Sequence, residues 1–415
     1  MSPDPNQQFD EFTPTSPAEL SRFVRDNADG DRRPLYPVGG RTLLNYGYPE
    51  PAPGVLVSTS ALTQTVDYPA RDMTITVEAG IRMNQLTEAL KKEQQQLPID
   101  VPQANRATVG GVVATNVSGP RRYGFGTLRD YVIGVSAVDA QGRLFKSGGR
   151  VVKNVAGYDL CKLLIGSMGT LAIMTQITFK LRPLSETSSF LWASFRSLAE
   201  IDDVLQRLNS SQTRPVALEV LNSEAMKQIA AESRQQIPTT SPILAIGVEG
   251  TRRDVNWQIE TLKKELAPFK PKELEVLDDE NAIKFRTSLT EFQCVSDDPL
   301  TFQANLLPSD TMEFAERATQ LGVAVQAHAG NGIVIGTLPD QAVTVEKAAE
   351  IVNPLRAFAS QNRGNLVVLY CENDWKRHIR VFGEPESSHH LMQQVKNAFD
   401  PHHLLNPGRF LENGT

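Results

Sequence analysis

The chain has 415 residues, with 42 lysines and arginines against 48 aspartates and glutamates and a net charge of −6 at pH 7. This length suffices for two or three domains and for a core that buries a sizeable ligand. The acidic balance, without a block of like charge, argues against a nucleic-acid-binding protein.

The cysteines and the N-terminal residues indicate the cellular compartment in which the protein is expected. Cys161, Cys294 and Cys371 are far apart and supply neither a disulfide framework nor a CxxC metal site, so we expect a reducing, cytoplasmic setting. Residues 1–15 form a polar leader unlike a signal peptide, and no stretch holds about 18 consecutive apolar residues. We expect no direct membrane insertion, and at most a peripheral position at the inner face of a membrane through partner subunits.

Residues 16–183 have the pattern of a mixed α/β domain. Ser16 is a typical N-cap, followed by a proline at the first helical position, and the short helix ends at Gly30. The runs "RPLYPVGG", "GVLVSTS" and "MTITVEAG" then predict strands, and "RMNQLTEALKKEQQ" predicts a helix. "TLAIMTQITFKLRP" closes the domain as one or two strands with an alternating apolar face.

Residues 190–385 follow a short polar linker and contain one order of elements twice. "FLWASF", "SLAEIDDVLQRLNSS", "PVALEVL", "PILAIGVEG" and "RRDVNWQIETLKKEL" predict a strand, a helix, two strands and a helix. The segments from "TFQANLLP" to "QAVTVEKAAEIVNPLRAFA" repeat this order, and "NLVVLYC" adds a last strand. Side by side, the two units predict one antiparallel sheet with helices on one face. Residues 386–415 form a separate tail.

Two glycine-containing segments could bind phosphate groups. "YPVGGRTLLNYG" runs from a strand end into a turn whose backbone N–H groups could form an anion-binding nest, although an ordinary structural turn explains it equally well. "ATVGGVVATNVSGPRRYGFG" adds hydroxyl and amide side chains, which suit a wall for a pyrophosphate or a flat heteroaromatic ring. Tight helix packing would explain some of its glycines, but not the Thr, Asn and Ser pattern.

A third segment, "GGRVVKNVAGYDLCKLLIGSMGTLAI", is uninformative by itself: Asp159 could cap a helix, and Lys153 and Lys162 are typical of solvated charges. Several familiar motifs are absent, namely GxGxxG, GxxxxGK[ST], GxSxG and HExxH. Nicotinamide enzymes, NTPases, α/β-hydrolases and zinc hydrolases are therefore unsupported.

In this order and spacing, the three segments resemble the FAD-binding domain of the vanillyl-alcohol oxidase and p-cresol methylhydroxylase (PCMH) type flavoproteins. "PVGGRTLL" is similar to the family's pyrophosphate loop, "ATVGGVVATNVSGPRRYG" to its ATIGG-type segment, and "GSMGTLAIMTQITFKLRP" to its closing strand. "DPHHLLNPGRF" resembles the tail that returns to the flavin. Within the family, "SGPRRYGFGTLRDYVIGV" and "KNVAGYD" are most similar to the GlcE-type FAD-binding subunits of glycolate oxidase.

The resemblance implies an α+β fold. A PCMH-type FAD-binding domain of two α/β subdomains (16–183) would precede a cap domain with an antiparallel sheet covered by helices (190–385) and a tail that returns to the first domain (386–415). FAD would be held non-covalently, because no histidine lies in the "GGRT" loop. The glycines would let the backbone lie against FAD. By position, the cofactor-binding residues would be Pro37, Gly39, Gly40, Arg41, Thr42, Leu43, Thr108, Gly110, Gly111, Ala114, Thr115, Asn116, Gly119, Gly124, Gly169, Ile173 and Asn406.

The implied activity is that of an FAD-dependent oxidoreductase acting on CH–OH groups. A hydride would leave the α-carbon of a 2-hydroxy acid while a base takes the hydroxyl proton. The chain would then be the FAD-binding subunit of a complex that oxidises glycolate to glyoxylate. Its partners would be a catalytic GlcD-like FAD-binding subunit and a GlcF-like iron–sulfur subunit that takes the electrons.

The chain departs from catalytic relatives at their "HAGDGNLH" and "GEHG" segments. "HAGNGIVI" keeps His328 but has Asn331 and Ile335 where those relatives have an aspartate and a second histidine, and "YCENDW" replaces "GEHG". We therefore assign no metal site and no catalytic base. A structural, hydrogen-bonded His328 remains an alternative to a catalytic one, and Arg121 and Arg122 are either carboxylate or partner contacts or ordinary exposed arginines. A self-sufficient FAD-dependent 2-hydroxy-acid dehydrogenase and a non-catalytic assembly subunit that has lost FAD are the alternative functions.

Overall fold

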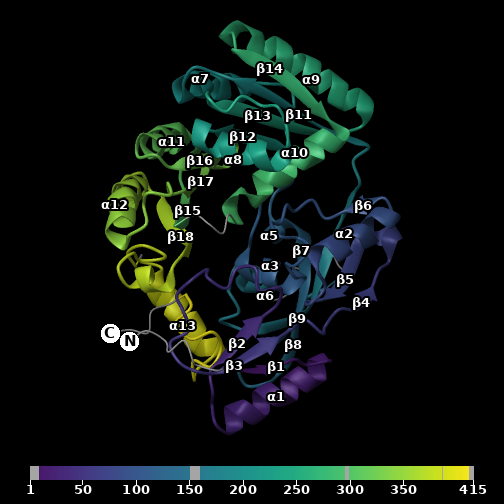
Figure 1. Cartoon of the computed structure of the whole chain (residues 1–415). Helices are drawn as coiled ribbons and strands as arrows, with labels where there is room; N and C mark the ends of the chain where they lie inside the picture. The colour runs from purple at the N-terminus through teal and green to yellow at the C-terminus, as the bar shows by residue number, and fades with distance from the viewer. Residues whose placement is uncertain (1–8, 150–158, 295–298, 386, 411–415) are drawn as a thin grey trace. The chain divides into compact units, whose positions relative to one another are not determined.

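The computed structural model describes residues 9–149, 159–294, 299–385 and 387–410 (Figure 1). The chain forms two compact units. The first comprises Met1–Ser118, Thr127–Leu184 and Glu384–Thr415, and the second comprises Gly119–Gly126 and Ser185–Gly383. The short segment Gly119–Gly126 therefore belongs to the second unit, although the chain on both sides of it belongs to the first.

The first unit begins with a small parallel sheet in the strand order β1-β3-β2, packed against helix α1. As predicted, the Ser16 side chain accepts a hydrogen bond from the first turn of this helix and Pro17 begins it. Leu20 and Val24 of the helix are buried with Leu35 and Val57 of the sheet. The bounds are β1 (Asp10–Phe12), α1 (Pro17–Asp29), β2 (Leu35–Val38) and β3 (Val55–Ser58).

An antiparallel sheet in the order β4-β5-β9-β7-β8 completes the strands of this unit, together with a short ribbon of β6 and β10. These strands are β4 (Thr65–Asp67), β5 (Thr74–Glu78), β6 (Gln95–Gln96), β7 (Val132–Val138), β8 (Leu144–Gly148), β9 (Ile173–Lys180) and β10 (Arg182–Pro183). The helices are η1 (Ala70–Asp72), α2 (Met83–Lys92), α3 (Val109–Thr115), α5 (Leu128–Tyr131), α6 (Leu160–Leu164) and α13 (His389–Phe399). As the sequence suggested, the Asp159 side chain caps α6.

The second unit is built on one antiparallel sheet in the order β14-β11-β13-β12-β16-β17-β15-β18. The strands are β11 (Thr187–Ser194), β12 (Ala217–Leu221), β13 (Ile243–Gly250), β14 (Glu273–Asp278), β15 (Leu300–Asn305), β16 (Ala324–His328), β17 (Ile333–Thr337) and β18 (Asn365–Cys371). The two predicted groups of strands thus join through β12 and β16, which pair antiparallel.

Helices cover both faces of this sheet, and not one face as the sequence predicted. Phe190 and Trp192 of β11 pack with α8 and α10 in one core cluster. The intervening Leu191 is also buried, and because side chains alternate along a strand it faces the other side, where α9 contacts β11 and β13. The helices are α4 (Arg122–Phe125), α7 (Leu198–Leu208), α8 (Ser223–Ser233), α9 (Arg252–Leu266), η2 (Ala267–Phe269), α10 (Asp279–Glu291), η3 (Phe292–Cys294), η4 (Pro308–Asp310), α11 (Thr311–Gln320), η5 (Ala329–Asn331), α12 (Val345–Gln361) and η6 (Asn373–Arg377).

A buried lysine attaches the C-terminal tail to the rest of the first unit. Lys396 of α13 donates hydrogen bonds to the Asp400 carboxylate at 2.6 Å and to the carbonyls of Thr170 and Leu405 at 2.7 and 2.8 Å. Asp400 is completely buried and also accepts from the backbone N–H groups of Leu404 and Leu405. Burial lowers the pKa of Lys396, and the Asp400 carboxylate opposes that shift. These bonds fix the "DPHHLLNPG" tail against the "MGT" turn.

We expect Lys396→Met to destabilise the first unit by about 3–5 kcal/mol, because it leaves the buried Asp400 carboxylate without its cation. The double variant Lys396→Met/Asp400→Asn should recover most of this loss. Lys91→Met is the matched control, since Lys91 forms an exposed pair with Glu88 and its loss should cost about 0–1 kcal/mol. Urea unfolding followed by circular dichroism measures all three, and a Lys396→Met effect no larger than that of the control would contradict this account.

Candidate functional site

The loop after β2 has the features of an anion-binding nest. In the described residues, the backbone N–H groups of 39–43 donate no hydrogen bond. A Cβ on Gly39 would overlap the Thr108 hydroxyl, and one on Gly40 would overlap the carbonyl of Arg106. The loop therefore lies directly against the residues that precede α3, and only glycine allows this approach.

The Thr108 hydroxyl lies beside this loop and is 4 % exposed as a residue. Its Oγ1 is buried without a hydrogen-bond partner in the part of the chain that the structure describes. An unpaired buried hydroxyl is costly, and it is one of the features expected where a ligand supplies the missing partner. The N–H groups and this hydroxyl are the donors that a pyrophosphate needs, so the residues present fit the phosphate part of a dinucleotide.

The glycines of these segments were expected to let the backbone lie against FAD. At Gly39, Gly40 and Gly110, the space that a Cβ would fill is taken by the chain itself. For Gly110 the nearest atom is the Ala79 Cβ, at 2.8 Å from the position that a Cβ would occupy. These three glycines let the loop, β5 and α3 approach one another closely. A ligand at this place would therefore contact backbone N–H groups and would not fill a gap left by missing side chains.

Three segments that are far apart in the sequence meet at Pro37, Gly169 and Asn406. Gly169 has φ +68°, and a Cβ there would come within 3.2 Å of the Asn406 amide and 3.4 Å of Pro37. Asn406 is buried, donates its side-chain amide to the Met168 carbonyl at 2.7 Å and bonds through its backbone N–H to Leu35. The predicted tail, loop and closing turn thus form one connected group.

The other predicted residues of the first unit have varied surroundings. Arg41 pairs with Glu11 at 2.7 Å, and Thr42 and Leu43 are half-buried. The Ala114 carbonyl accepts from the Met168 N–H, the Thr115 hydroxyl donates to the Gly111 carbonyl, and Asn116 ends α3 in the left-handed conformation. Ile173 packs in the core beside Leu35 and Val138. Residues 153–158 of the "KNVAGYD" run, with Lys153 and Asn154, lie outside the described residues.

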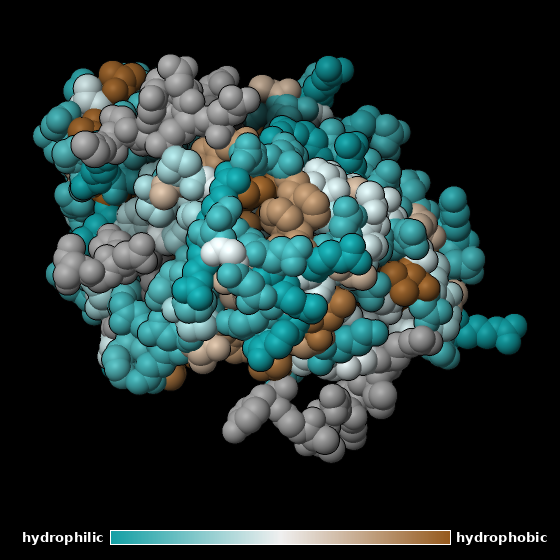
Figure 2. All heavy atoms as spheres, turned by 90° about the horizontal axis from the view of Figure 1, so that it is seen from below, coloured by the Kyte–Doolittle hydropathy of each residue, from teal (hydrophilic) through white to brown (hydrophobic). Residues whose placement is uncertain are grey.

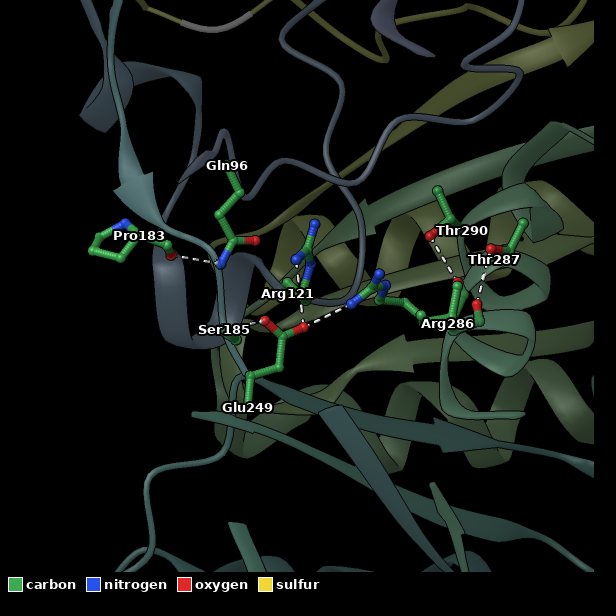
Figure 3. Close-up of polar contacts among 9 residues, drawn as sticks. Gln96, Arg121, Pro183, Ser185, Glu249, Arg286, Thr287 and Thr290 are labelled. Atoms are coloured by element: carbon green, nitrogen blue, oxygen red, sulfur yellow. Dashed lines mark hydrogen bonds and ion pairs between the residues drawn. The ribbon is translucent and has the colours of Figure 1, made fainter. Parts of the chain in front are cut away.

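Gly119 and Gly124 belong to the second unit, where segment Gly119–Gly126 docks on the sheet. The Gly124 N–H bonds to the Val216 carbonyl, and a Cβ on Gly124 would come within 2.6 Å of the Val216 Cα. Arg121 holds the segment further, because its guanidinium contacts the buried Glu249 carboxylate at 3.4 Å (Figure 3). Arg286 of α10 reaches the same carboxylate at 2.6 Å, and Ser185 bonds to it as well.

A second polar group lies at the middle of the sheet, where β12 and β16 pair. Glu219 is completely buried, and its carboxylate accepts hydrogen bonds from Gln326 Nε2 at 2.7 Å and contacts His328 Nδ1 at 2.7 Å. Burial lowers the pKa of Arg122 in the docked segment, and the negative charge of Glu219 opposes that shift. His328 is thus hydrogen-bonded, but to a buried carboxylate on a strand and not merely within a turn.

Some candidate residues were not singled out from the sequence. Ser167 precedes Gly169 in the "GSMGT" turn, and its Oγ is buried without a partner among the described residues. Glu219 and Gln326 each stand as a polar residue in an apolar strand, "ALEVL" and "VAVQAH". That interruption of an apolar run was the available signal, because a charge in a buried strand requires a partner.

Comparisons with known proteins give the family. Residues 11–148 match the model of the FAD binding domain, and residues 184–367 and 383–410 match the C-terminal domain of FAD linked oxidases. The chain belongs to the FAD-linked oxidase family, and its cofactor is FAD. A solved structure of p-cresol methylhydroxylase with substrate bound has a TM-score of 0.73 at 17 % identity, covering 96 % of this chain and 88 % of that chain. The predicted PCMH-type α+β fold is therefore confirmed.

Curated relatives are more similar in sequence than this solved structure is. Glycolate oxidase subunit GlcD of Bacillus subtilis is 26 % identical over 96 % of this chain and 88 % of its own length, and a D-lactate dehydrogenase of Anaerostipes hadrus is 26 % identical over 95 % and 88 %. Glycolate oxidase subunit GlcE of Escherichia coli is 31 % identical over 46 % of this chain and 54 % of its own length. These likenesses define an FAD-linked oxidoreductase family, and the narrower resemblance to GlcE-type subunits stays a prediction.

Figure 2 shows a mainly hydrophilic face on which the hydrophobic residues form small, separate patches. Among the described helices, none is long and apolar enough to cross a membrane. Over the same residues, no group of three or more His, Cys, Asp or Glu side chains is arranged to hold a metal ion.

Thr108→Val tests the loop as the pyrophosphate site, because it removes the unpaired hydroxyl and keeps the side-chain volume. We expect FAD to bind roughly 10- to 100-fold more weakly, the value of a hydrogen bond to a charged group, with the melting temperature of the FAD-free protein unchanged. Thr74→Val is the matched control, since the Thr74 hydroxyl in β5 is likewise buried and unpaired among the described residues. Equal FAD dissociation constants for Thr108→Val and wild type, measured by fluorescence titration, would exclude the hydroxyl from the site.

Proposed function

We propose that this chain is the FAD-binding subunit of a glycolate-oxidising complex of the GlcE type. The observation that carries the proposal is the row of unpaired N–H groups at 39–43 beside the unpaired Thr108 hydroxyl, within a domain that matches the FAD binding domain. The similarity to glycolate oxidase subunits and to a D-lactate dehydrogenase supports a small 2-hydroxy acid as the substrate. The product of glycolate oxidation would be glyoxylate.

The chain's own residues would bind the cofactor without a covalent bond. The N–H groups of 39–43 and the Thr108 hydroxyl would donate to the pyrophosphate oxygens, with the Arg41 charge nearby. Gly110, Gly111, Ala114, Thr115, Asn116, Gly169 and Asn406 would line the same site. Bound FAD supplies a hydride acceptor. Ile173 and Gly124 are not included in this proposal, because their packing explains them without a ligand, and Gly119 is left out because it belongs to the second unit.

Electrons would pass from this subunit to an iron–sulfur partner of the GlcF type, in a complex that also contains a catalytic GlcD-type subunit. The resemblance of the chain to both GlcD and GlcE supports membership of such a complex. We propose a cytoplasmic location, with any membrane contact made through the partners. A complex of this kind would explain why "HAGNGIVI" lacks the second histidine of the catalytic relatives.

A self-sufficient 2-hydroxy-acid dehydrogenase is the second candidate. Two observations favour it: the likeness to a D-lactate dehydrogenase spans 95 % of the chain, whereas that to GlcE spans 46 %, and His328 has a buried carboxylate as its partner. An assembly subunit that has lost FAD is disfavoured by the donors still present at 39–43 and Thr108.

The two candidates differ in what the purified chain does alone. As a subunit, the chain should be yellow, and its flavin absorbance near 450 nm, an approximate value typical of flavoproteins, should bleach on anaerobic addition of glycolate only when the partners are present. Affinity purification from the native cell should bring down an iron–sulfur protein. Steady glycolate turnover by the isolated chain with an artificial acceptor would favour the self-sufficient enzyme, and a colourless protein that ignores added FAD would contradict both.

A further inference from the structure

Helix α13 of the first unit, yellow in Figure 1, has an apolar side that is not its buried side. Its sequence is HHLMQQVKNAF, and the residue that it buries is Lys396. Leu391 is 62 % exposed and Met392 is 40 % exposed. In an ordinary surface helix the apolar residues face the core and the charged residues face water. The arrangement in α13 is the reverse.

The apolar residues of α13 form one continuous stripe, because successive residues of a helix are about 100° apart. The stripe consists of Leu391, Met392, Val395, Ala398 and Phe399. It spans about 120° of the helix surface with Val395 at its centre, and Lys396 points about 100° away from that centre. Val395 and Phe399 are half-buried, and the other three members are exposed.

Helix α13 is attached to its own unit through polar contacts that do not involve the stripe. The Lys396 ammonium group bonds to the Asp400 carboxylate and to two backbone carbonyls. Among the described helices and strands, none has more than a slight contact with α13. Apolar surface left in water costs about 25 cal/mol per Å² relative to burial. A continuous exposed stripe of this kind is typical of an interaction surface.

The surroundings of the stripe contain no acidic side chain and no arginine. The sequence of α13 has no Asp, Glu or Arg, and its single lysine is the buried Lys396. The exposed residues on the opposite side are His390, Gln394 and Asn397. Since 22 % of the residues of this chain are charged, this helix is unusual in it. Depletion of charge around an apolar centre is typical of protein interfaces, so the surface that fits here is apolar and uncharged.

The order of the apolar residues is symmetrical about Val395. Leu391 and Phe399 are each four positions away from it, and Met392 and Ala398 are each three positions away. If two copies of α13 run antiparallel with a two-fold axis at Val395, Leu391 of one copy meets Phe399 of the other. Met392 then meets Ala398, a long side chain against a small one. Each helix N-terminus also lies beside the other C-terminus, which favours the pairing electrostatically.

We propose that the stripe on α13 joins two copies of this chain in an antiparallel helix pair with its two-fold axis at Val395. The inference goes beyond the proposed function and does not depend on it. The helix is about 16 Å long, which is too short to bury alone the roughly 800 Å² per partner of a standard interface. The dimer is therefore weak, with a dissociation constant on the order of micromolar. Because α13 and residues 39–43 belong to the same unit, dimerisation links two FAD-binding units.

Sedimentation equilibrium of the full FAD-loaded chain, over a range of concentrations, tests the dimer. Leu391→Glu places a charge without a partner in the helix pair and should raise the dissociation constant roughly 10-fold or more. Val343→Glu is the matched control, since Val343 of the second unit is 65 % exposed and lies outside the stripe. It should dimerise like the wild type. Circular dichroism and flavin content show that each variant is folded.

Cysteine cross-linking tests the antiparallel arrangement. In Val395→Cys the two-fold axis places the new thiol next to its own copy, so oxidised glutathione should link two chains through a disulfide. Leu391→Cys is the control, because the two copies of residue 391 are about 12 Å apart along the helix pair. A disulfide cannot bridge Cα atoms more than about 7 Å apart. Only Val395→Cys should therefore give a cross-linked dimer on a denaturing gel without reductant.

Each outcome supports or overturns the proposal. A wild-type chain that stays monomeric at all concentrations overturns it, and so does a dimer that Leu391→Glu leaves unchanged. Equal cross-linking of Leu391→Cys and Val395→Cys contradicts the antiparallel pairing. If the wild-type chain is monomeric and Leu391→Glu instead loses another subunit on affinity purification, the stripe binds that subunit and not a second copy. A failure of glycolate to reduce the flavin contradicts the proposed function alone.

Discussion

The first unit depends on the approach of Gly39 and Gly40 to the backbone before α3. A single methyl group on either residue would overlap Thr108 or Arg106, so the loop can occupy its place only as glycine. The contact brings a row of N–H groups and one hydroxyl to the same point, and none of them finds a partner in the described chain. We propose that this close packing of the protein against itself prepares a place for the phosphates of FAD.

The second unit faces a different constraint, which is the burial of charge. Glu249 has two arginines as partners, and through Arg121 it fixes a segment that the sequence places inside the other unit. Glu219 has Gln326 and His328. Beside Glu219, the Gln326 Oε1 atom is buried without a hydrogen-bond partner among the described residues.

The sequence predicted the start of α1 because the Ser16 cap and Pro17 depend on local chemistry, and the structure confirms both. The sequence also predicted helices on one face of the large sheet only. That prediction was wrong because α8 and α10 were not recognised as helices. Gly124 was predicted to bind the cofactor, and nothing local indicates that its neighbour is Val216. Glu219 was missed because its partners, Gln326 and His328, are distant in sequence.

The central claim is that the backbone of residues 39–43 binds the pyrophosphate of FAD. Hydrogen–deuterium exchange of the FAD-free and FAD-loaded protein tests it most directly, because these amides have no partner within the described residues and the cofactor would supply one. Our account predicts fast exchange at 39–43 without FAD and strong slowing with it. If the amides of 39–43 exchange equally fast in both forms, the pyrophosphate is bound elsewhere and the account is wrong.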